Sequence, residues 1–158
     1  EDLTTPGASL RVGDAAVVPF SAGDASGVIR IVVRDIAVGP RSDVADLDLP
    51  ERARGWVPTY VRYTVTGRSD SAQLAGYSVD DSIDAVLRNG SPAQELHVIG
   101  DWAPCDKQSV PRGFADGDRF ESCVTFLSPR GRPIEAARYA PTEGDYNAFD
   151  GRPVLWRR

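Results

Sequence analysis

The chain has 158 residues, 41% of them hydrophobic and 26% charged, which is the size and composition of one globular domain with a buried core. Its net charge of -5 disfavours binding to nucleic acid and to anionic membranes, because both attract basic proteins. No apolar run approaches the roughly 20 residues that a spanning helix needs, and the first residues lack the basic and apolar regions of an export signal. We therefore expect no membrane span.

The N-terminal part predicts a lead-in followed by a β-hairpin. Residues 1–8 are polar, with a Pro-Gly pair, and predict a flexible lead-in to one domain that covers residues 9–158. The segment 15–20 is a short apolar strand, and its Pro19 lacks the N–H of a central strand, which places this strand at a sheet edge. Turn-forming residues at 21–27 then lead into the next strand.

Residues 27–38 carry the strongest strand pattern in the chain. One face carries Ile29, Ile31 and Val33 and the other carries Arg30 and Arg34. Ile36 has the opposite parity to Ile29 and Ile31. A β-bulge near residues 34–35 would return both sets to the core.

Six further strands follow, separated by turns rich in Gly, Pro, Asn and Asp. One helical turn is expected at 43–49, and an irregular crossing that contains Trp56 at 50–58. In the next strand Val61, Tyr63 and Val65 share one face. The predicted strands cover residues 59–66, 83–87, 95–99, 118–127, 133–139 and 153–157.

The chain contains two cysteines, Cys105 and Cys123, 18 residues apart. With His97 as the single histidine, there are too few soft ligands for a structural zinc site. A disulfide is favoured, and it would stabilise the fold by roughly 3 kcal/mol in the chain-entropy model and imply an extracytoplasmic location. Two buried, unpaired thiols in a cytosolic protein are the alternative.

The alternation along residues 118–127 indicates where such a disulfide would lie. Phe120, Val124 and Phe126 share one face, so Cys123 points to the other. The bond would then pin the loop at 102–114 to the outside of the sheet, unlike the disulfide inside an antibody domain.

About eight short strands without a long amphipathic helix predict an all-β fold, namely an antiparallel β-sandwich with one local disulfide. An eight-stranded β-barrel is the alternative.

Three segments carry a resemblance to a known family: Tyr-Val-Arg-Tyr-Thr-Val-Thr at 60–66, Pro-Cys at 104–105 followed by Gly-Asp-Arg-Phe-Glu-Ser-Cys at 117–123, and Pro-Val-Leu-Trp at 153–156. Together they resemble small secreted proteins and lipoproteins of actinobacteria with an immunoglobulin-like β-sandwich, such as the mycobacterial immunoprotective extracellular antigen. The resemblance implies export, is compatible with a lipid anchor upstream of Glu1, and implies a non-catalytic role. The chain departs from this pattern at Gly67, where such strands often continue with Asn.

Few residues predict catalysis or metal binding. His97 could be a general base or a metal ligand, but no Gly-x-Ser-x-Gly nucleophile motif accompanies it, and an ordinary exposed histidine is the simpler interpretation. The acidic turns lack the pattern of an EF-hand loop, and the sequence supplies no distance for a pair of glycosidase carboxylates. We expect no enzyme activity, no metal site and no cofactor. The acidic residues that could bind calcium are Asp43, Asp46, Asp48, Asp80, Asp81, Asp84, Asp116 and Asp118.

Aromatic residues in loops are the remaining candidates for a binding surface. Trp102, Phe114 and Trp56 lie in or near predicted loops, where aromatic rings can contact sugars or proteins, although each could instead close one end of the sandwich, as could Trp156. We predict a non-catalytic secreted or cell-envelope module that binds an envelope protein or polysaccharide. A carbohydrate-binding or calcium-dependent domain, and a structural spacer, are the alternatives, and the oligomeric state is left open.

Overall fold

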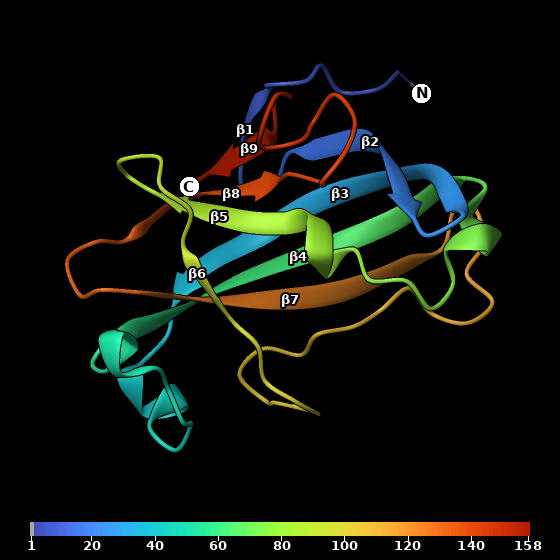
Figure 1. The fold of residues 1–158 in the computed structure, drawn as a ribbon. Helices are drawn as coiled ribbons and strands as arrows, with labels where there is room; N and C mark the ends of the chain where they lie inside the picture. Colours follow the sequence, from blue (N-terminus) through green and yellow to red (C-terminus); the bar gives the residue numbers. More distant parts are fainter. Residues whose placement is uncertain (1) are drawn as a thin grey trace.

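Nine β-strands form two sheets that pack face to face in the computed structural model, which describes residues 2–158 (Figure 1). The prediction of an all-β sandwich is confirmed, and the two separate sheets exclude a closed barrel. The strands are β1 (Ser9–Arg11), β2 (Ala15–Ala22), β3 (Ala25–Val38), β4 (Val57–Ser69), β5 (Ile83–Leu87), β6 (Gln94–Leu96), β7 (Arg119–Ser128), β8 (Ile134–Tyr139) and β9 (Val154–Arg157). Four short 3-10 helices are η1 (Arg41–Val44), η2 (Glu51–Ala53), η3 (Ser71–Leu74) and η4 (Asp80–Ser82).

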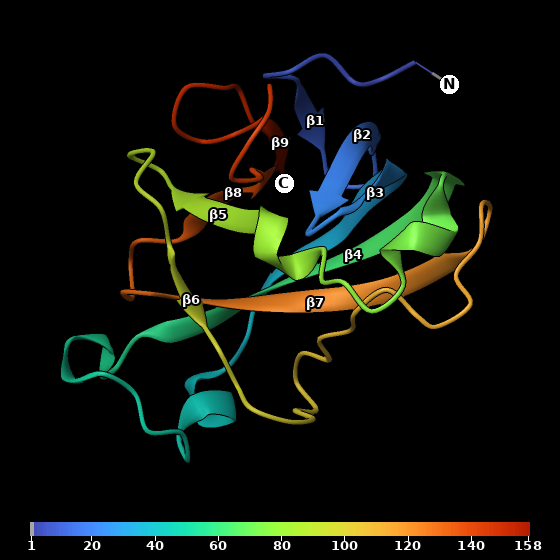
Figure 2. The same ribbon diagram turned by 45° about the vertical axis from the view of Figure 1, so that its right-hand side comes forward.

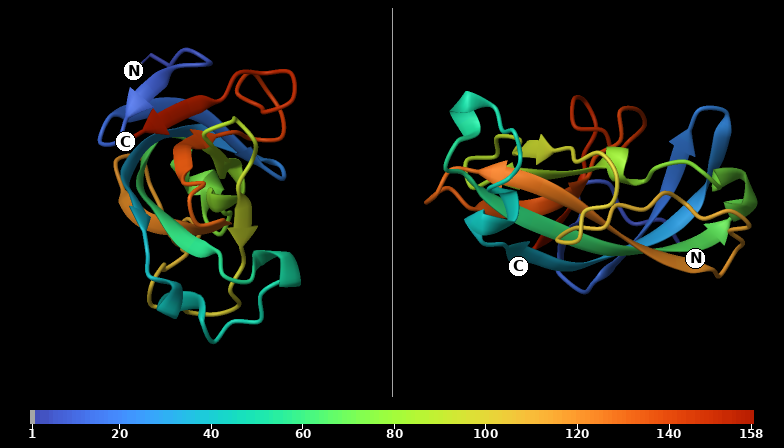
Figure 3. Two further views of the ribbon diagram at one scale, coloured as in Figure 1. Left: turned by 90° about the vertical axis from the view of Figure 1, so that its left-hand side faces the viewer. Right: turned by 90° about the horizontal axis from the view of Figure 1, so that it is seen from below.

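The larger sheet has the order β2-β3-β4-β7-β6 and the smaller one the order β1-β9-β8-β5, so that the two layers lie one above the other in Figure 2. All strand pairs are antiparallel except β1 with β9, which is parallel. The sequence did not predict β1, because three residues are too few for a pattern of alternation. The long, twisted strands of the larger sheet curve around the smaller one when the molecule is viewed along its length (Figure 3).

Two features predicted for the β2-β3 hairpin are confirmed. β2 lies at the edge of its sheet, where Pro19 is tolerated because an edge strand pairs on one side only and does not need every backbone N–H. The register of β3 against β4 shifts between Val33 and Asp35, which is a bulge. Ile31 and Ile36 are therefore both buried in the core, in spite of their opposite parity.

The inner faces of the two sheets form the main core. Trp156, Tyr63 and Tyr139 are the largest fully buried side chains, and Trp156 donates its indole N–H to the Asp14 carbonyl oxygen at 3.0 Å. Trp156 thus serves packing, one of the two roles considered for the tryptophans. Its polar nitrogen has a partner, as a buried donor requires.

Within the expected flexible lead-in, the N-terminal segment makes hydrogen bonds to the sandwich. The N–H of Thr4 donates to the Val17 carbonyl oxygen and its Oγ1 accepts from the Val17 N–H, both at 2.8 Å. The N–H of Gly7 donates to the Arg152 carbonyl oxygen at 2.9 Å. Of the predicted lead-in at 1–8, Glu1 lies outside the described residues.

The segment between β3 and β4 projects from one end of the sandwich (Figure 1). Its predicted helical turn appears as η1, slightly earlier in the chain than expected. Val44 and Ala53 form a small second core there with Leu127 of β7. Among residues 2–158, none of the helices has the length and apolar character to cross a bilayer.

Candidate functional site

The segment at residues 97–118, which we call the stapled loop, follows β6 and passes below β7 on the side away from the smaller sheet (Figure 2). β6 pairs with β7 only at the three positions from Thr125 to Leu127. Prolines and glycines in the stapled loop prevent the chain from continuing as a strand, so it covers the rest of the β7 edge as irregular backbone. This edge is where the two cysteines meet.

Cys105 and Cys123 form a disulfide, with their Cα atoms 5.3 Å apart. The sulfur atoms lie in a small cluster with Tyr60 and Trp102, apart from the main core. This placement confirms that Cys123 points to the outer face of the sheet, as the alternation along β7 predicted. The disulfide therefore holds the loop against the outside of the sandwich.

Beyond the disulfide, the loop turns back into the core. Val110 is buried, its N–H donates to the Tyr77 carbonyl oxygen at 2.9 Å, and its carbonyl oxygen accepts from the Gly76 N–H at 2.8 Å. Phe114 is 3% exposed and packs edge to face on Phe120. Phe114 is therefore a core residue, and its prediction as part of an exposed binding surface was wrong.

Trp102 is half-buried and joins the disulfide cluster to the small second core. Its ring packs edge to face on Tyr60, with the ring centroids 5.9 Å apart. The Tyr60 hydroxyl donates to Asp43 at 2.7 Å, and burial together with this carboxylate raises the tyrosine pKa. Trp56 packs against the same second core, so both tryptophans combine packing with partial exposure.

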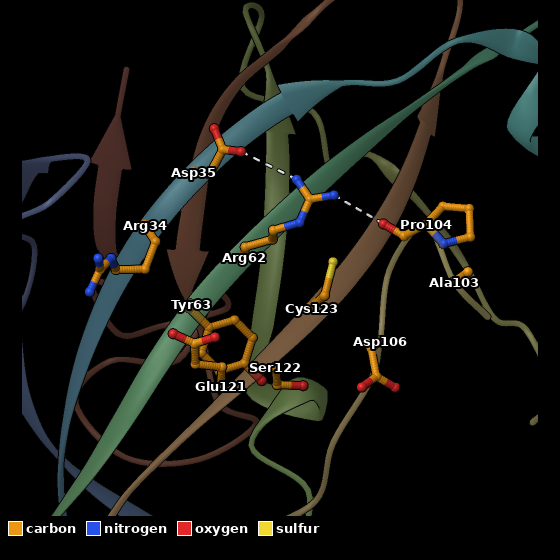
Figure 4. A pocket seen from close by; sticks show the side chains of 10 residues that line it. All are labelled: Arg34, Asp35, Arg62, Tyr63, Ala103, Pro104, Asp106, Glu121, Ser122 and Cys123. Atoms are coloured by element: carbon orange, nitrogen blue, oxygen red, sulfur yellow. Dashed lines mark hydrogen bonds and ion pairs between the residues drawn. The ribbon is translucent and has the colours of Figure 1, made fainter. Parts of the chain in front are cut away.

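Arg62 on β4 ties the outer face of the sheet to the stapled loop (Figure 4). Its guanidinium forms an ion pair with Asp35 at 3.2 Å and donates to the Pro104 carbonyl oxygen at 3.0 Å. The same group lies 5.2 Å from the centroid of the Tyr60 ring. Because the Arg34 bulge places Asp35 opposite Arg62, the β-bulge is part of this arrangement.

A hollow of about 380 Å³, which we call the Arg62 hollow, lies beside these groups (Figure 4). Arg34 and Arg62 line it together with the carboxylates Asp35, Asp106 and Glu121. Because the lining contains both arginines and carboxylates, it can bind negatively or positively charged groups.

A buried carboxylate lies on the inner side of the same strands. Asp80 of η4 is 1% exposed and accepts hydrogen bonds from the Tyr63 hydroxyl and, at 2.8 Å, from the Ser122 hydroxyl. The N–H of Gln108 donates to the Ser122 hydroxyl oxygen at 2.9 Å, which connects the stapled loop to this network. Burial raises the pKa of Asp80, although the hydrogen bonds from Tyr63 and Ser122 oppose the shift.

The sequence placed Asp80 in a solvated acidic turn, which was wrong. The sequence contained one indication that Asp80 is buried, because the buried strand β5 begins only three positions later, at Ile83. Residues in a turn do not alternate regularly, so this position did not reveal that the Asp80 side chain faces inward. Asp43 also has an internal partner, the hydroxyl of Tyr60. Within residues 2–158 there is no group of three or more acidic, histidine or cysteine side chains close enough together to hold a metal ion.

His97 is exposed, and its Nε2 lies 2.5 Å from a carboxylate oxygen of Glu95. The strand expected at 95–99 ends at Leu96, so the following residues belong to the stapled loop. Ile99 is consequently fully exposed to solvent. Sequence reasoning missed Ile99, because an isoleucine at the end of a strand pattern is expected to be buried.

Comparisons with known proteins place the fold. No family model matches the sequence, and no curated protein matches it. The structure is similar to MPT63, a secreted protein from Mycobacterium tuberculosis, over 98% of this chain and 100% of that chain, with 12% identity and a TM-score of 0.60. The predicted resemblance is thus confirmed for the fold.

A second similar structure is an uncharacterised β-sandwich protein from Clostridium difficile 630, with 10% identity, coverage of 99% of this chain and 97% of that chain, and a TM-score of 0.46.

Proposed function

We propose that the chain is a non-catalytic binding module that acts outside the cytoplasm and recognises an envelope protein or polysaccharide through the stapled loop. The observation that carries the proposal is the fully exposed Ile99 on a loop that the Cys105–Cys123 disulfide holds to a rigid sheet. Loops that a rigid scaffold positions are common recognition elements, and a fixed backbone loses little entropy on binding.

The disulfide and the fold support the extracytoplasmic part of the proposal. Disulfides persist in oxidising compartments and are rare in the cytosol. The likeness to a secreted mycobacterial protein agrees with this location. Anchoring by a lipid upstream of Glu1 remains compatible with it.

The environment of the titratable groups supports a role without catalysis. Asp80 is buried from solvent, and its carboxylate accepts hydrogen bonds from the hydroxyl groups of Tyr63, Ser122 and Ser78. His97 is exposed and paired with Glu95 outside the Arg62 hollow. Catalytic groups are expected to combine a perturbed pKa with access to a cleft.

The test is retention of partners from an envelope extract by the immobilised, folded protein. Ile99→Ser is the informative variant, because replacing a fully exposed side chain leaves stability within about 0.5 kcal/mol. Trp102→Ala is less clean, since Trp102 also packs on Tyr60. Leu3→Ser is the matched control, because Leu3 is 51% exposed on the N-terminal segment.

We expect wild type and the Leu3→Ser control to retain the same partner and Ile99→Ser to retain much less. Equal recovery by all three proteins would refute the loop as the interface. Recovery of no partner at all would refute the binding module and leave a structural spacer.

A polysaccharide ligand is favoured by one specific observation, the half-exposed Trp56 between two surface hollows of about 550 and 440 Å³. A glycan array with wild type and Trp56→Ala tests it, and binding that Trp56→Ala abolishes would move the site from Ile99 to Trp56. A calcium-dependent form of this alternative predicts a fall in melting temperature when EDTA is added.

A further inference from the structure

Phe149 is a large aromatic side chain that the fold leaves in water. It lies in the loop at 140–153, which joins β8 to β9, and is 89% exposed. Figure 1 shows this loop above the smaller sheet. Its apolar surface is available for burial against a partner.

The backbone around Phe149 is fixed by a buried asparagine. Asn147 Oδ1 accepts from the N–H groups of Phe149 at 2.8 Å, Asp150 at 2.9 Å and Gly151 at 3.3 Å. Its Nδ2 donates to the Gly144 carbonyl oxygen at 2.6 Å and to Asp150 Oδ1 at 2.7 Å. The loop therefore presents Phe149 from a preorganised backbone.

Tyr146 anchors the same loop from inside. Its ring is buried against Tyr139, and its hydroxyl donates to the Thr4 carbonyl oxygen at 2.6 Å. Aromatic groups three positions apart thus have opposite roles, with Tyr146 in the core and Phe149 in solvent. A rigid aromatic group of this kind binds with a small entropic cost.

Charge and shape limit what can cover Phe149. Glu143, Asp145 and Asp150 are exposed in the same loop, and Arg152 is its single exposed cation, which disfavours an anionic membrane. Because Phe149 protrudes, a flat sugar ring would cover only one side of it. A concave apolar site with a basic rim fits it better.

The chain itself carries such a site, which we call the Trp56 hollow. Its volume is about 440 Å³. Arg52 and Arg132 lie at its rim. Arg52 donates to Gln94 Oε1 at 2.7 Å, and Arg132 has no ion pair in the part of the chain that the structure describes. Gln94 and Glu95 also line the hollow, and the Glu95 carboxylate is paired with His97. The apolar lining consists of Trp56, Leu87, Pro92, Ala93, Leu127 and Pro129.

Phe149 and the Trp56 hollow lie at opposite ends of the smaller sheet. The loop at 140–153 follows Tyr139, whereas Leu87 at the hollow pairs with Ile134 at the beginning of β8. The two sites therefore meet between molecules and not within one.

We propose that Phe149 of one copy of this chain inserts into the Trp56 hollow of a second copy. The carboxylates of the Phe149 loop then lie against Arg52 and Arg132, and their opposite charges fix the orientation. Reciprocal contacts close a dimer, and one-way contacts build a chain of molecules, because the two patches differ. This self-association is independent of the partner proposed for the stapled loop.

Sedimentation velocity of the purified protein tests the contact, from about 10 μM to about 1 mM at low and at high salt, a range that detects weak association. We expect concentration-dependent association that weakens at high salt. Phe149→Ala is expected to weaken it about tenfold, the effect of truncating an aromatic hot spot. Tyr77→Ala, which truncates another exposed aromatic side chain, is the matched control and leaves association unchanged.

A charge exchange tests the orientation. Arg132→Glu is expected to weaken association, and adding Asp145→Arg to that variant is expected to restore it, since both side chains are exposed. A protein that stays monomeric at low salt and the highest concentration would overturn the proposal. So would an equal loss in Tyr77→Ala and Phe149→Ala, or a charge exchange that fails to restore association.

Discussion

Replacing Cys105 and Cys123 together by alanine tests how the disulfide stabilises the fold. The bond closes a loop with a sequence separation of 18 residues. In the chain-entropy model the cross-link lowers the conformational entropy of the unfolded state, which stabilises the folded state by about 3 kcal/mol. The double variant should lose this amount from its free energy of unfolding. For a domain of this size the corresponding fall in melting temperature is about 6 to 12 °C.

The position of the disulfide predicts what the double variant keeps. The sulfur atoms pack with Tyr60 and Trp102 outside the main core. Other contacts still hold the loop, among them the hydrogen bonds from Arg62 to the Pro104 carbonyl oxygen, from the Gln108 N–H to Ser122 and from the Val110 N–H to the Tyr77 carbonyl oxygen. We therefore expect a folded variant whose β4 and β7 amides remain protected from hydrogen exchange.

Guanidinium denaturation followed by tryptophan fluorescence measures the loss, and exchange monitored by NMR measures the protection. The denaturant slope should also rise, because the unfolded variant is less compact than the cross-linked chain. Wild type, denatured without reductant, should show no free thiol. A loss below about 1 kcal/mol would refute the entropic argument, and loss of protection along β4 and β7 would show that the disulfide organises the sandwich itself.

Three further predictions concern the interior. Burial raises the pKa of Asp80 in the folded protein above its value near 3.8 in the unfolded chain. Asp80 therefore contributes most to stability below the unfolded pKa, and this contribution is lost as pH rises through the folded pKa. In urea titrations from acid to neutral pH, Asp80→Asn should gain stability relative to wild type as pH rises over this window. Gly67→Ala would place a Cβ 2.9 Å from the Ala115 carbonyl oxygen and should cost about 1 to 3 kcal/mol in denaturant titrations, with unchanged stability as the contrary result. Trp156→Phe should lower the free energy of unfolding by about 1 to 3 kcal/mol, because the Asp14 carbonyl loses its donor and a gap remains; a melting temperature equal to wild type would contradict this.

Gly67 also explains one departure from the family pattern. Its N–H donates to the Asp118 carbonyl oxygen, and its own carbonyl oxygen accepts from the Gly117 N–H. An added Cβ would meet backbone and the Ser71 side chain, so the position tolerates no larger residue without a local shift. The close approach of two loops at the end of β4, and not the strand pattern, requires glycine here.

The sequence by itself determined the features that follow from strand alternation. A period of two residues assigns each side chain to one of two faces, so the parity of Ile31 and Ile36 was enough to predict the bulge in β3. The same period placed Cys123 on the outer face of β7, and the disulfide is found there. Local backbone geometry carries this information wherever a strand continues.

Only the tertiary structure decided the fate of residues in loops. Phe114 and Asp80 are buried, whereas Ile99 and Phe149 are exposed. Hydrophobicity alone would predict that the aspartate is exposed and that the isoleucine and both phenylalanines are buried. A loop has no period, so the burial of its side chains depends on which distant segment passes over them. The stapled loop enters the core at Val110 because of contacts with Gly76 and Tyr77, residues that the sequence does not connect to it.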